Sequence, residues 1–318
     1  MPKVSVCVPI YGVEKYIERC VKSLFEQTLV DMEFIFVDDS TKDKSIEILK
    51  NLIEDYPNRK HQVKILRHEQ NMGLSFARET GVKAATGDYI AHCDSDDWVK
   101  KDMFEKLYNF AEKGKYDFVK SGKIISDGDK ELLEELVFTE NGKTDRESVI
   151  RYLLLQKGWN SIWNVLVARR VYEKAHIIYT PNAMLEDYFL VTQLLLACTK
   201  IGIVNAAFYF YFINPDSISR VVGTESLILK SQQAEKNIKH ILFFIDKEYG
   251  TKFKDEEIAL LFIPRRILIP VMNRKENFRY WKITTPGISL KILQSRYISF
   301  THKLWYLEAA LGLRLLLK

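Results

Sequence analysis

The sequence has few cysteines, few prolines and no long apolar run. Its 318 residues include only four cysteines, at positions 7, 20, 93 and 198. None has Cys-x-x-Cys spacing, so neither a zinc ribbon nor a disulfide framework is indicated, and buried reduced thiols are expected. Prolines number only 8, hydrophobic residues make up 47% and charged residues 28%, a composition that argues against disorder.

Long apolar runs are also missing. No window reaches the roughly 20 apolar residues of a membrane-spanning helix. The nearest approach, residues 258–269, is interrupted by Pro264, Arg265 and Arg266. The sequence opens on a strand-like run rather than a signal-peptide core, so no signal peptide is expected.

Two nucleotide-binding signatures are absent as well. There is no Gly-rich P-loop and no Gly-x-Gly-x-x-Gly, which disfavours NTPases and dehydrogenases.

The net charge of +5 is unevenly distributed along the chain: residues 221–318 carry 17 Lys and Arg against 9 Asp and Glu, whereas residues 1–220 carry 30 against 33. The basic residues are spread out and match no nucleic-acid-binding module, so no nucleic-acid partner is expected.

Short apolar runs alternate with helical periods in the first half of the chain. Strands are predicted at 4–8, 34–37, 63–66 and 89–93 and from 118 onward. Helices are predicted at 17–25, around 46–53, and at 74–85, 103–111, 148–155 and 188–196. This alternation indicates an α/β fold in which helices cover both faces of a mostly parallel sheet. Beyond about residue 223 the chain is helical and basic, which places a domain boundary between 222 and 223.

Carboxylates gather where two of these strands end. Asp38 and Asp39 follow the second strand, and Asp94, Asp96 and Asp97 follow the fourth. One Asp suffices to cap a helix, and five carboxylates at neighbouring strand ends repel one another unless a cation compensates. Ligands bind at these strand ends in open α/β sheets. Asp-x-Asp supplies hard oxygen ligands that suit Mg²⁺ or Mn²⁺ beside a diphosphate, so a metal at Asp94 and Asp96 is predicted.

Four segments together resemble glycosyltransferase family 2: residues 4–16, 37–43, 71–78 and 87–97. They stand in the family's order and spacing over roughly the first 100 residues, and weaker similarity continues to about Arg220. The resemblance implies a GT-A fold with a Rossmann-like, mixed and mostly parallel sheet. It implies a nucleotide-sugar half at about 1–100 and an acceptor half at about 101–222, followed by the helical region 223–318.

The resemblance also implies a donor site. Its residues are Pro9, Tyr11, Glu14, Asp38, Asp39, Asn71, Arg78, Asp94 and Ser95, with Asp94 and Asp96 as metal ligands. Arg78 suits a diphosphate on physical grounds too, because it is a cation early in a helix, where backbone N–H groups favour anions. One departure is visible, since the family usually has Gly where this chain has Ser40.

Sugar transfer also needs a base for the acceptor hydroxyl. Glu186 and Asp187 resemble the family's Glu-Asp pair at the start of a helix, which implies that Asp187 is the base and that Glu186 orients its neighbours. Taken alone, the pair would be read as an N-terminal helix cap.

Further segments resemble the family on the acceptor side and near the nucleotide. Residues 159–164 match an acceptor-side segment, in which Trp159 or Trp163 either stacks on a sugar or packs in the core. Residues 209–220, with Ser217 and Ser219, resemble a loop that closes over the nucleotide.

The predicted activity is metal-dependent, inverting transfer of a hexose from a nucleotide-sugar, with UDP favoured and dTDP or GDP open. The acceptor is a hydroxyl of a saccharide, a glycolipid or another cell-surface glycan, as in bacterial polysaccharide biosynthesis. The alternatives are a nucleotidyltransferase, which would need a Gly-rich basic loop after the first strand, and a non-catalytic GT-A partner subunit. A cytoplasmic location is expected, free or at the inner face of the cell membrane. The apolar segment 304–317 could bind a membrane surface, pack on the catalytic domain or form an oligomer contact.

Overall fold

The computed structural model describes residues 1–137, 139, 142–181, 184–214, 223–271, 280, 284 and 288–311. The chain divides into two compact units. The first comprises 1–149, 161–182 and 194–215, and the second comprises 150–160, 183–193 and 216–318. The predicted boundary after residue 222 stays a prediction.

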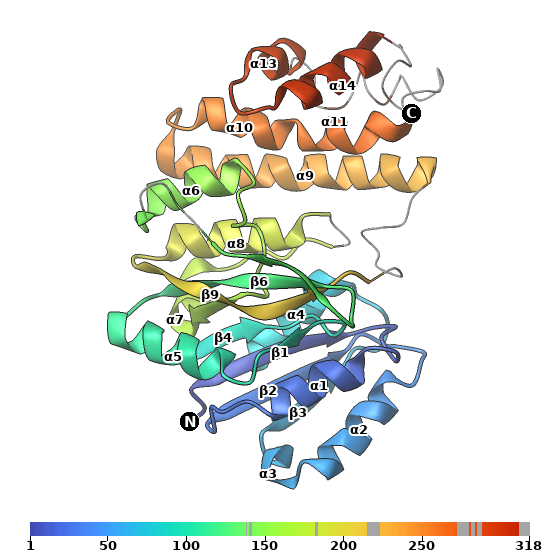
Figure 1. The fold of residues 1–318 in the computed structure, drawn as a ribbon, viewed down its shortest axis with the longest axis vertical. Helices are drawn as coiled ribbons and strands as arrows, with labels where there is room; N and C mark the ends of the chain where they lie inside the picture. Colours follow the sequence, from blue (N-terminus) through green and yellow to red (C-terminus); the bar gives the residue numbers. More distant parts are fainter. Residues whose placement is uncertain are drawn as a thin grey trace. The chain divides into compact units, whose positions relative to one another are not determined.

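A mixed sheet forms the framework of the first unit (Figure 1). Its strands are β1 (Val4–Ile10), β2 (Met32–Asp38), β3 (Val63–Arg67), β4 (Tyr89–His92), β5 (Trp98–Val99), β6 (Phe118–Ser126), β7 (Glu131–Glu135), β8 (Val165–Ala168) and β9 (Ile201–Phe212). The order is β3-β2-β1-β4-β8-β6-β9-β5, and β7 pairs with β6. Strands β1, β2, β3, β4, β6 and β9 share one direction, and β5, β7 and β8 run the opposite way. The predicted mixed, mostly parallel α/β sheet is confirmed.

Four helices of the first unit lie where the hydrophobic periods place them: α1 (Ile17–Phe25), α2 (Ser45–Asp55), α4 (Leu74–Ala84) and α5 (Met103–Gly114). The short helices α3 (Pro57–Lys60) and α7 (Arg169–Ala175) were not predicted. On α1, all five residues of the predicted apolar face are buried. Because parallel crossovers are right-handed, the reversal in strand order puts α4 on the face opposite α1 and α2, as Figure 1 shows.

The predicted pattern includes the start of β6 but omits β5, β7, β8 and β9. Strand β8 is a fully buried four-residue run, and β9 is a twelve-residue apolar run whose sequence has no period of two. Both pair in the middle of the sheet, β8 antiparallel to β4 and β6, and β9 parallel to β6. A strand covered on both faces, such as β8, lacks alternation, and β9 has no period of two, so periodicity alone distinguishes neither strand.

Helices dominate the second part of the chain, as predicted. The remaining helices are α6 (Arg146–Leu154), α8 (Glu186–Ala197), α9 (Thr224–Tyr249), α10 (Lys254–Leu261), α11 (Ile263–Leu268), the 3-10 turn η3 (Ile269–Val271), α13 (Ser289–Gln294) and α14 (Phe300–Leu311). Helices α10, α11, α13 and α14 share an apolar cluster that includes Phe262, Ile292 and Tyr306. Among the described residues no helix is long and apolar enough to cross a membrane.

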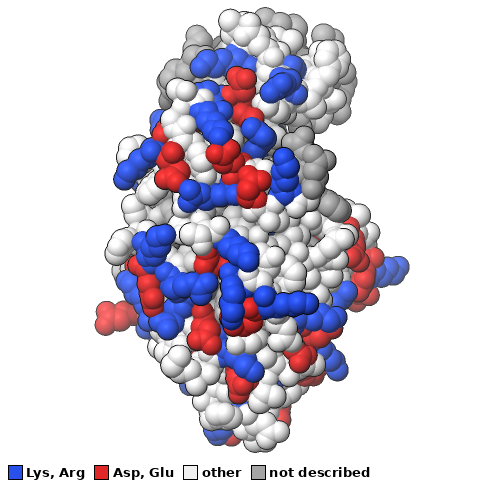
Figure 2. Space-filling model, turned by 90° about the vertical axis from the view of Figure 1, so that its left-hand side faces the viewer, with Lys and Arg blue, Asp and Glu red and all other residues white. Residues whose placement is uncertain are grey.

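The surface mixes charges of both signs. On the face drawn in Figure 2, Lys and Arg side chains stand beside Asp and Glu side chains in several groups, with uncharged surface between them. Exposed ion pairs such as Lys115–Glu112 and Lys22–Glu18 are of the kind that contribute little to stability. The four cysteines are buried thiols, as predicted.

Candidate active site

The strand order reverses between β1 and β4, and the loops that contain the predicted site residues leave the sheet at that point. Strand β1 pairs with β2 on one side and with β4 on the other. The loops that follow β1, β2 and β4 therefore emerge at the same edge of the sheet. In open α/β sheets this switch point is where ligands bind, and it carries the sequence-predicted carboxylates.

The loops after β1 and β2 are joined by hydrogen bonds. The Glu14 amide donates to Asp43 Oδ2 at 2.8 Å, and Glu14 Oε2 accepts from the Lys44 amide at 2.9 Å. The Gly12 amide donates to Thr41 Oγ1 at 2.9 Å. Glu14 thus fixes the loop, while the Tyr11 ring next to it is 51% exposed.

Asp38 and Asp39 have different surroundings although both are buried. Asp38 Oδ1 accepts from the Thr41 amide at 2.8 Å, which closes its own turn. Asp39 accepts from the amides of Met72 and Gly73, each at 2.8 Å, and its Oδ1 lies 2.7 Å from Nδ1 of His68. Asp39 therefore ties the loop before α4 to the end of β2.

These hydrogen bonds bring Asn71, a predicted residue of the nucleotide-sugar site, to the same edge of the sheet. Asn71 is exposed and directly precedes the two amides that Asp39 accepts. Gly73 has φ +89°, a left-handed backbone that favours glycine. His68, which the sequence analysis did not select, also contacts Thr80 Oγ1 at 2.8 Å through Nε2 and so links Asp39 to α4.

Ser40, the departure from the family pattern, has a left-handed backbone with φ +59°. An L-residue in this region costs about 1–2 kcal/mol, whereas the extra unfolded-state freedom of glycine costs about 0.5–1 kcal/mol. Ser40→Gly is therefore expected to leave the melting temperature unchanged or to raise it slightly. Ser40→Ala, which keeps the backbone strain, is the matched control, and a melting temperature lower for glycine than for alanine would contradict this account.

Arg78 and Asp94 form a pair at the centre of the site. Arg78 is 1% exposed, and its Nη2 donates to Asp94 Oδ1 at 2.9 Å. The Asp94 side chain keeps 25% of its surface exposed. The predicted diphosphate cation is thus held beside a predicted metal ligand, which fixes the direction of that carboxylate.

Asp96 and Asp97 complete the acidic turn, which runs from Asp94 to Asp97, and their side chains have different hydrogen-bond partners. Burial, followed by the nearby Asp94 charge, raises the pKa of Asp96. Its Oδ2 accepts from Asn214 Nδ2 at 2.8 Å. Burial also raises the pKa of Asp97, whose Oδ1 accepts from the Phe212 amide at 2.7 Å. Ser95, between the metal-motif aspartates, is buried.

These residues fit a hard divalent cation. No cluster of three metal-ligating side chains occurs within the described ranges. Mg²⁺ and Mn²⁺ at nucleotide sites take one or two carboxylates and complete their shells with phosphate oxygens and water, so the pair Asp94 and Asp96 is a sufficient protein contribution. The raised pKa of Asp96 marks a carboxylate that a nearby positive charge would stabilise.

Glu186 and Asp187 begin α8, two residues earlier than the predicted start of that helix. Both side chains are half-buried. The segment before them is fixed within the second unit, because Asn237 Nδ2 donates to the Met184 carbonyl at 2.8 Å. Just after them, the Tyr188 hydroxyl donates to the Leu153 carbonyl.

The two predicted acceptor-side tryptophans are both buried. Trp163 stacks on Tyr209 with ring centroids 4.4 Å apart, and Trp159 is fully buried in the second unit. Tyr209 itself lies in β9 rather than in a loop, so the predicted loop begins no earlier than Ile213. Residues 215–220, with Ser217 and Ser219, lie outside the described residues.

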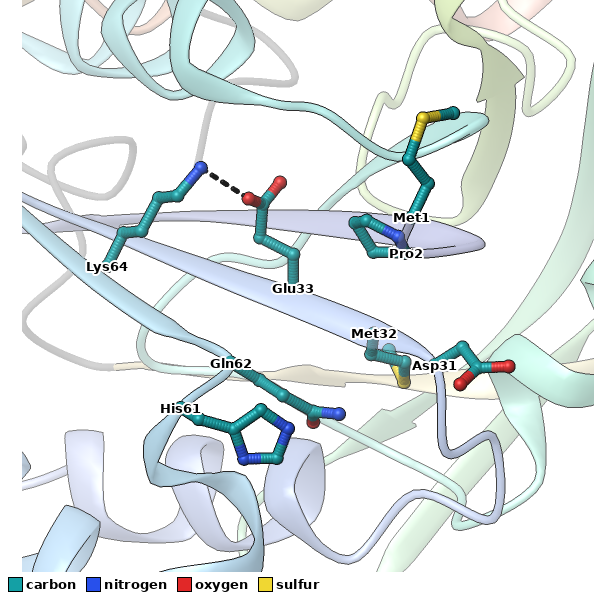
Figure 3. Close-up of a pocket in the computed structure, with 8 residues that line it drawn as sticks. All are labelled: Met1, Pro2, Asp31, Met32, Glu33, His61, Gln62 and Lys64. Atoms are coloured by element: carbon teal, nitrogen blue, oxygen red, sulfur yellow. Dashed lines mark ion pairs between the residues drawn. The ribbon is translucent and has the colours of Figure 1, made fainter.

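A hollow of about 330 Å³ lies at the other edge of the sheet. Its lining residues are Met1, Pro2, Asp31, Met32, Glu33, His61, Gln62 and Lys64. They come from the amino ends of β1, β2 and β3, and Figure 3 shows the 2.5 Å ion pair between Lys64 and Glu33 beside it. Glu33 also accepts from Ser5 Oγ at 2.7 Å. The hollow is therefore separate from the carboxyl-end loops.

Comparison with known proteins agrees with this geometry. The family model described as glycosyl transferase family 2 matches residues 5–190. The chain belongs to glycosyltransferase family 2. It is 32% identical over 228 residues to the uncharacterized glycosyltransferase EpsJ of Bacillus subtilis, which covers 70% of this chain and 64% of that protein. It is 30% identical over 250 residues to the cholesterol galactosyltransferase of Borreliella burgdorferi, covering 76% and 67%.

Solved structures of similar fold cover nearly the whole family 2 chain. The crystal structure of S. aureus TarS 1–349 in complex with UDP-GlcNAc superposes with a TM-score of 0.63 at 16% identity, covering 98% of this chain and 91% of that one. The mannosyltransferase PcManGT from Pyrobaculum calidifontis, in complex with GDP-Man and Mn²⁺, has a TM-score of 0.60 at 16% identity, covering 98% and 86%. At these identities the likeness shows the fold, and the expected GT-A architecture is confirmed. Among curated relatives, the chain spans 64% of EpsJ and 32% of Streptococcus pneumoniae GlyA.

Proposed function

We propose that the protein is a metal-dependent, inverting glycosyltransferase that moves a hexose from a UDP-sugar to a hydroxyl of a saccharide, glycolipid or other cell-surface glycan. The observation that carries the proposal is the turn from Asp94 to Asp97 at the switch point of the sheet, with the buried Arg78 paired to Asp94. A buried cation and two carboxylates at that edge suit a metal-bound diphosphate.

In the proposed mechanism the loops after β1 and β2 bind the nucleoside. Tyr11 is exposed for stacking, and Asp39 has a carboxylate already oriented by two backbone amides. Asp94 and Asp96 would hold Mn²⁺ or Mg²⁺ together with the diphosphate, and the cation would supply positive charge opposite the departing nucleoside diphosphate. Arg78 keeps Asp94 in place during this step.

Asp187 is proposed to take the proton of the acceptor hydroxyl, and Glu186 to orient the groups around it. The acceptor oxygen forms its bond to the anomeric carbon as the bond from that carbon to the diphosphate oxygen breaks. A single displacement of this kind inverts the anomeric configuration. The basis for this assignment is the family resemblance of Glu186 and Asp187 at the start of a helix.

The donor class can be tested with a panel of UDP-, GDP- and dTDP-sugars incubated with Mn²⁺ and without acceptor. Slow release of the nucleoside diphosphate is expected from a UDP-sugar, because glycosyltransferase sites admit water in place of the acceptor. Release from GDP- or dTDP-sugars alone would change the donor assignment. Formation of a nucleotide-sugar and pyrophosphate from a sugar phosphate and UTP would instead identify a nucleotidyltransferase.

We further propose that the C-terminal region supports association, at the inner face of the cell membrane or between copies of the chain. Phe300 and Leu290 are 74% and 64% exposed, whereas Tyr306 is buried in the apolar cluster of this unit. Removing residues 312–318, which include four leucines, should lower binding to anionic vesicles or change the oligomeric state. Vesicle sedimentation and light scattering check this, with Phe300→Ser as a companion variant; no change in either would remove the association role.

A further inference from the structure

The acidic turn is braced by a hydroxyl from a distant strand. The Asp94 amide donates to the Tyr209 hydroxyl oxygen at 3.0 Å, and the Tyr209 hydroxyl donates to Asp97 Oδ2 at 2.7 Å. One hydroxyl therefore accepts from the first residue of the turn and donates to the last. The turn is also closed directly, because the Asp97 amide donates to the Asp94 carbonyl at 3.1 Å.

The Tyr209 ring has little freedom to move. Tyr209 is completely buried in β9, and Trp163 stacks on it with centroids 4.4 Å apart and planes at 27°. The same Trp163 ring lies 5.6 Å from the ring of Tyr211. Trp163 belongs to a turn that the buried Lys120 anchors through Asn164 Oδ1 at 2.7 Å. A packed ring of this kind places its hydroxyl rigidly.

Asp97 belongs to the brace rather than to the ligand set. Its carboxylate is 2% exposed, and both oxygens are occupied, one by the Phe212 amide and one by Tyr209. Asp94, in contrast, points a partly exposed carboxylate at Arg78. The strand β9 therefore fixes the backbone of the turn, and Arg78 fixes the side chain that leaves it.

A second contact acts on the same turn from α1. The Arg19 guanidinium stacks 3.6 Å above the Trp98 ring and donates through Nη2 to the Asp96 carbonyl at 3.3 Å. The Asp96 carboxylate accepts its hydrogen bond from Asn214 rather than from Arg19. The backbone of the turn is thus held at both Asp94 and Asp96 by groups that are not themselves carboxylates.

We propose that Tyr209 is a positioning residue for the metal-binding turn: its hydroxyl sets the spacing of Asp94 and Asp96 by bracing Asp94 against Asp97. The proposal rests on the metal-dependent function proposed above. Without the hydroxyl the Asp94 amide loses its acceptor and the turn can rotate. The two metal ligands then have to be ordered when the cation and nucleotide bind, which weakens that binding.

Tyr209→Phe tests this, because it keeps the ring and its stacking and removes only the hydroxyl. Amide exchange at Asp94, followed by NMR, should become about tenfold faster, as expected for loss of one hydrogen bond. The Mn²⁺ concentration at half-maximal UDP binding should rise about tenfold by the same reasoning, while turnover at saturating Mn²⁺ returns close to that of the parent. Tyr89→Phe is the matched control, since Tyr89 is a buried tyrosine of β4 whose hydroxyl donates to Glu112 instead.

The outcomes separate the brace from the function. Unchanged Asp94 exchange and an unchanged Mn²⁺ midpoint in Tyr209→Phe would overturn the proposal. If the parent protein binds no UDP with Mn²⁺, the proposed function fails, and the exchange rate of the Asp94 amide still decides whether the brace exists. Should Tyr209→Phe fold poorly, Asp97→Asn replaces one of the two accepting oxygens of Asp97 with an amide nitrogen and should also speed Asp94 exchange; protection equal to the parent in that variant would count against the brace.

Discussion

Asp96→Ala is expected to lower sugar transfer by about 10²–10³-fold, the range for loss of one main group that stabilises transition-state charge. The variant should stay folded. The pKa of Asp96 is raised in the folded state, so its ionisation weakens folding as the pH rises from its unfolded pKa through its folded one. Alanine has no carboxyl group and therefore removes that penalty. The melting temperature should therefore hold or rise while activity falls.

Asp102→Ala is the matched control for Asp96→Ala. Asp102 lies six residues further on and makes an exposed 2.5 Å ion pair with Lys106. Surface changes of this kind alter stability by less than about 0.5 kcal/mol and should leave transfer unchanged. Near-normal turnover in Asp96→Ala, with Mn²⁺ dependence retained, would remove Asp96 from the metal site.

Asp187→Asn is expected to reduce kcat by roughly 10²-fold or more, because the side chain keeps its shape but no longer accepts a proton. Affinity for the nucleotide should change little, since Asp187 is not assigned to the diphosphate. Steady-state kinetics together with UDP calorimetry separate the two quantities. Glu186→Gln, next to it at the start of α8, should have the smaller effect.

The stereochemistry of the product gives a second test of the same base. NMR of the new linkage should show a β-linked product from an α-linked donor. A product that keeps the donor's configuration would contradict the inverting assignment. Near-normal turnover in Asp187→Asn, together with a strong loss in Glu186→Gln, would transfer the base role to Glu186.

Local sequence signals were enough to predict the first half of the sheet. Strands β1 to β4 and helices α1, α2, α4 and α5 all have their own apolar periods, and topology then places their carboxyl-end loops together. The position of Asp39, Asp94 and Asp96 at the carboxyl ends of these strands could be predicted because they come within a few residues of the ends of β2 and β4.

The partners of those carboxylates could not be predicted in the same way. Tyr209 is 115 residues from Asp94 along the chain and stands in a run of aromatic residues with no feature that marks its hydroxyl. Its position depends on β8 and β9, whose apolar runs carry no helical or strand period. His68 likewise gains its contact with Asp39 only through the pairing of β2 with β3.

The most direct test of the central claim is calorimetry of UDP binding with Mn²⁺ and after treatment with EDTA. The account predicts at least about tenfold tighter binding with the cation, because Asp94 and Asp96 would otherwise face a diphosphate of the same sign. In Asp96→Ala that gain should disappear. Equal affinity for UDP with Mn²⁺ and after EDTA would contradict a metal-held nucleotide at the turn from Asp94 to Asp97.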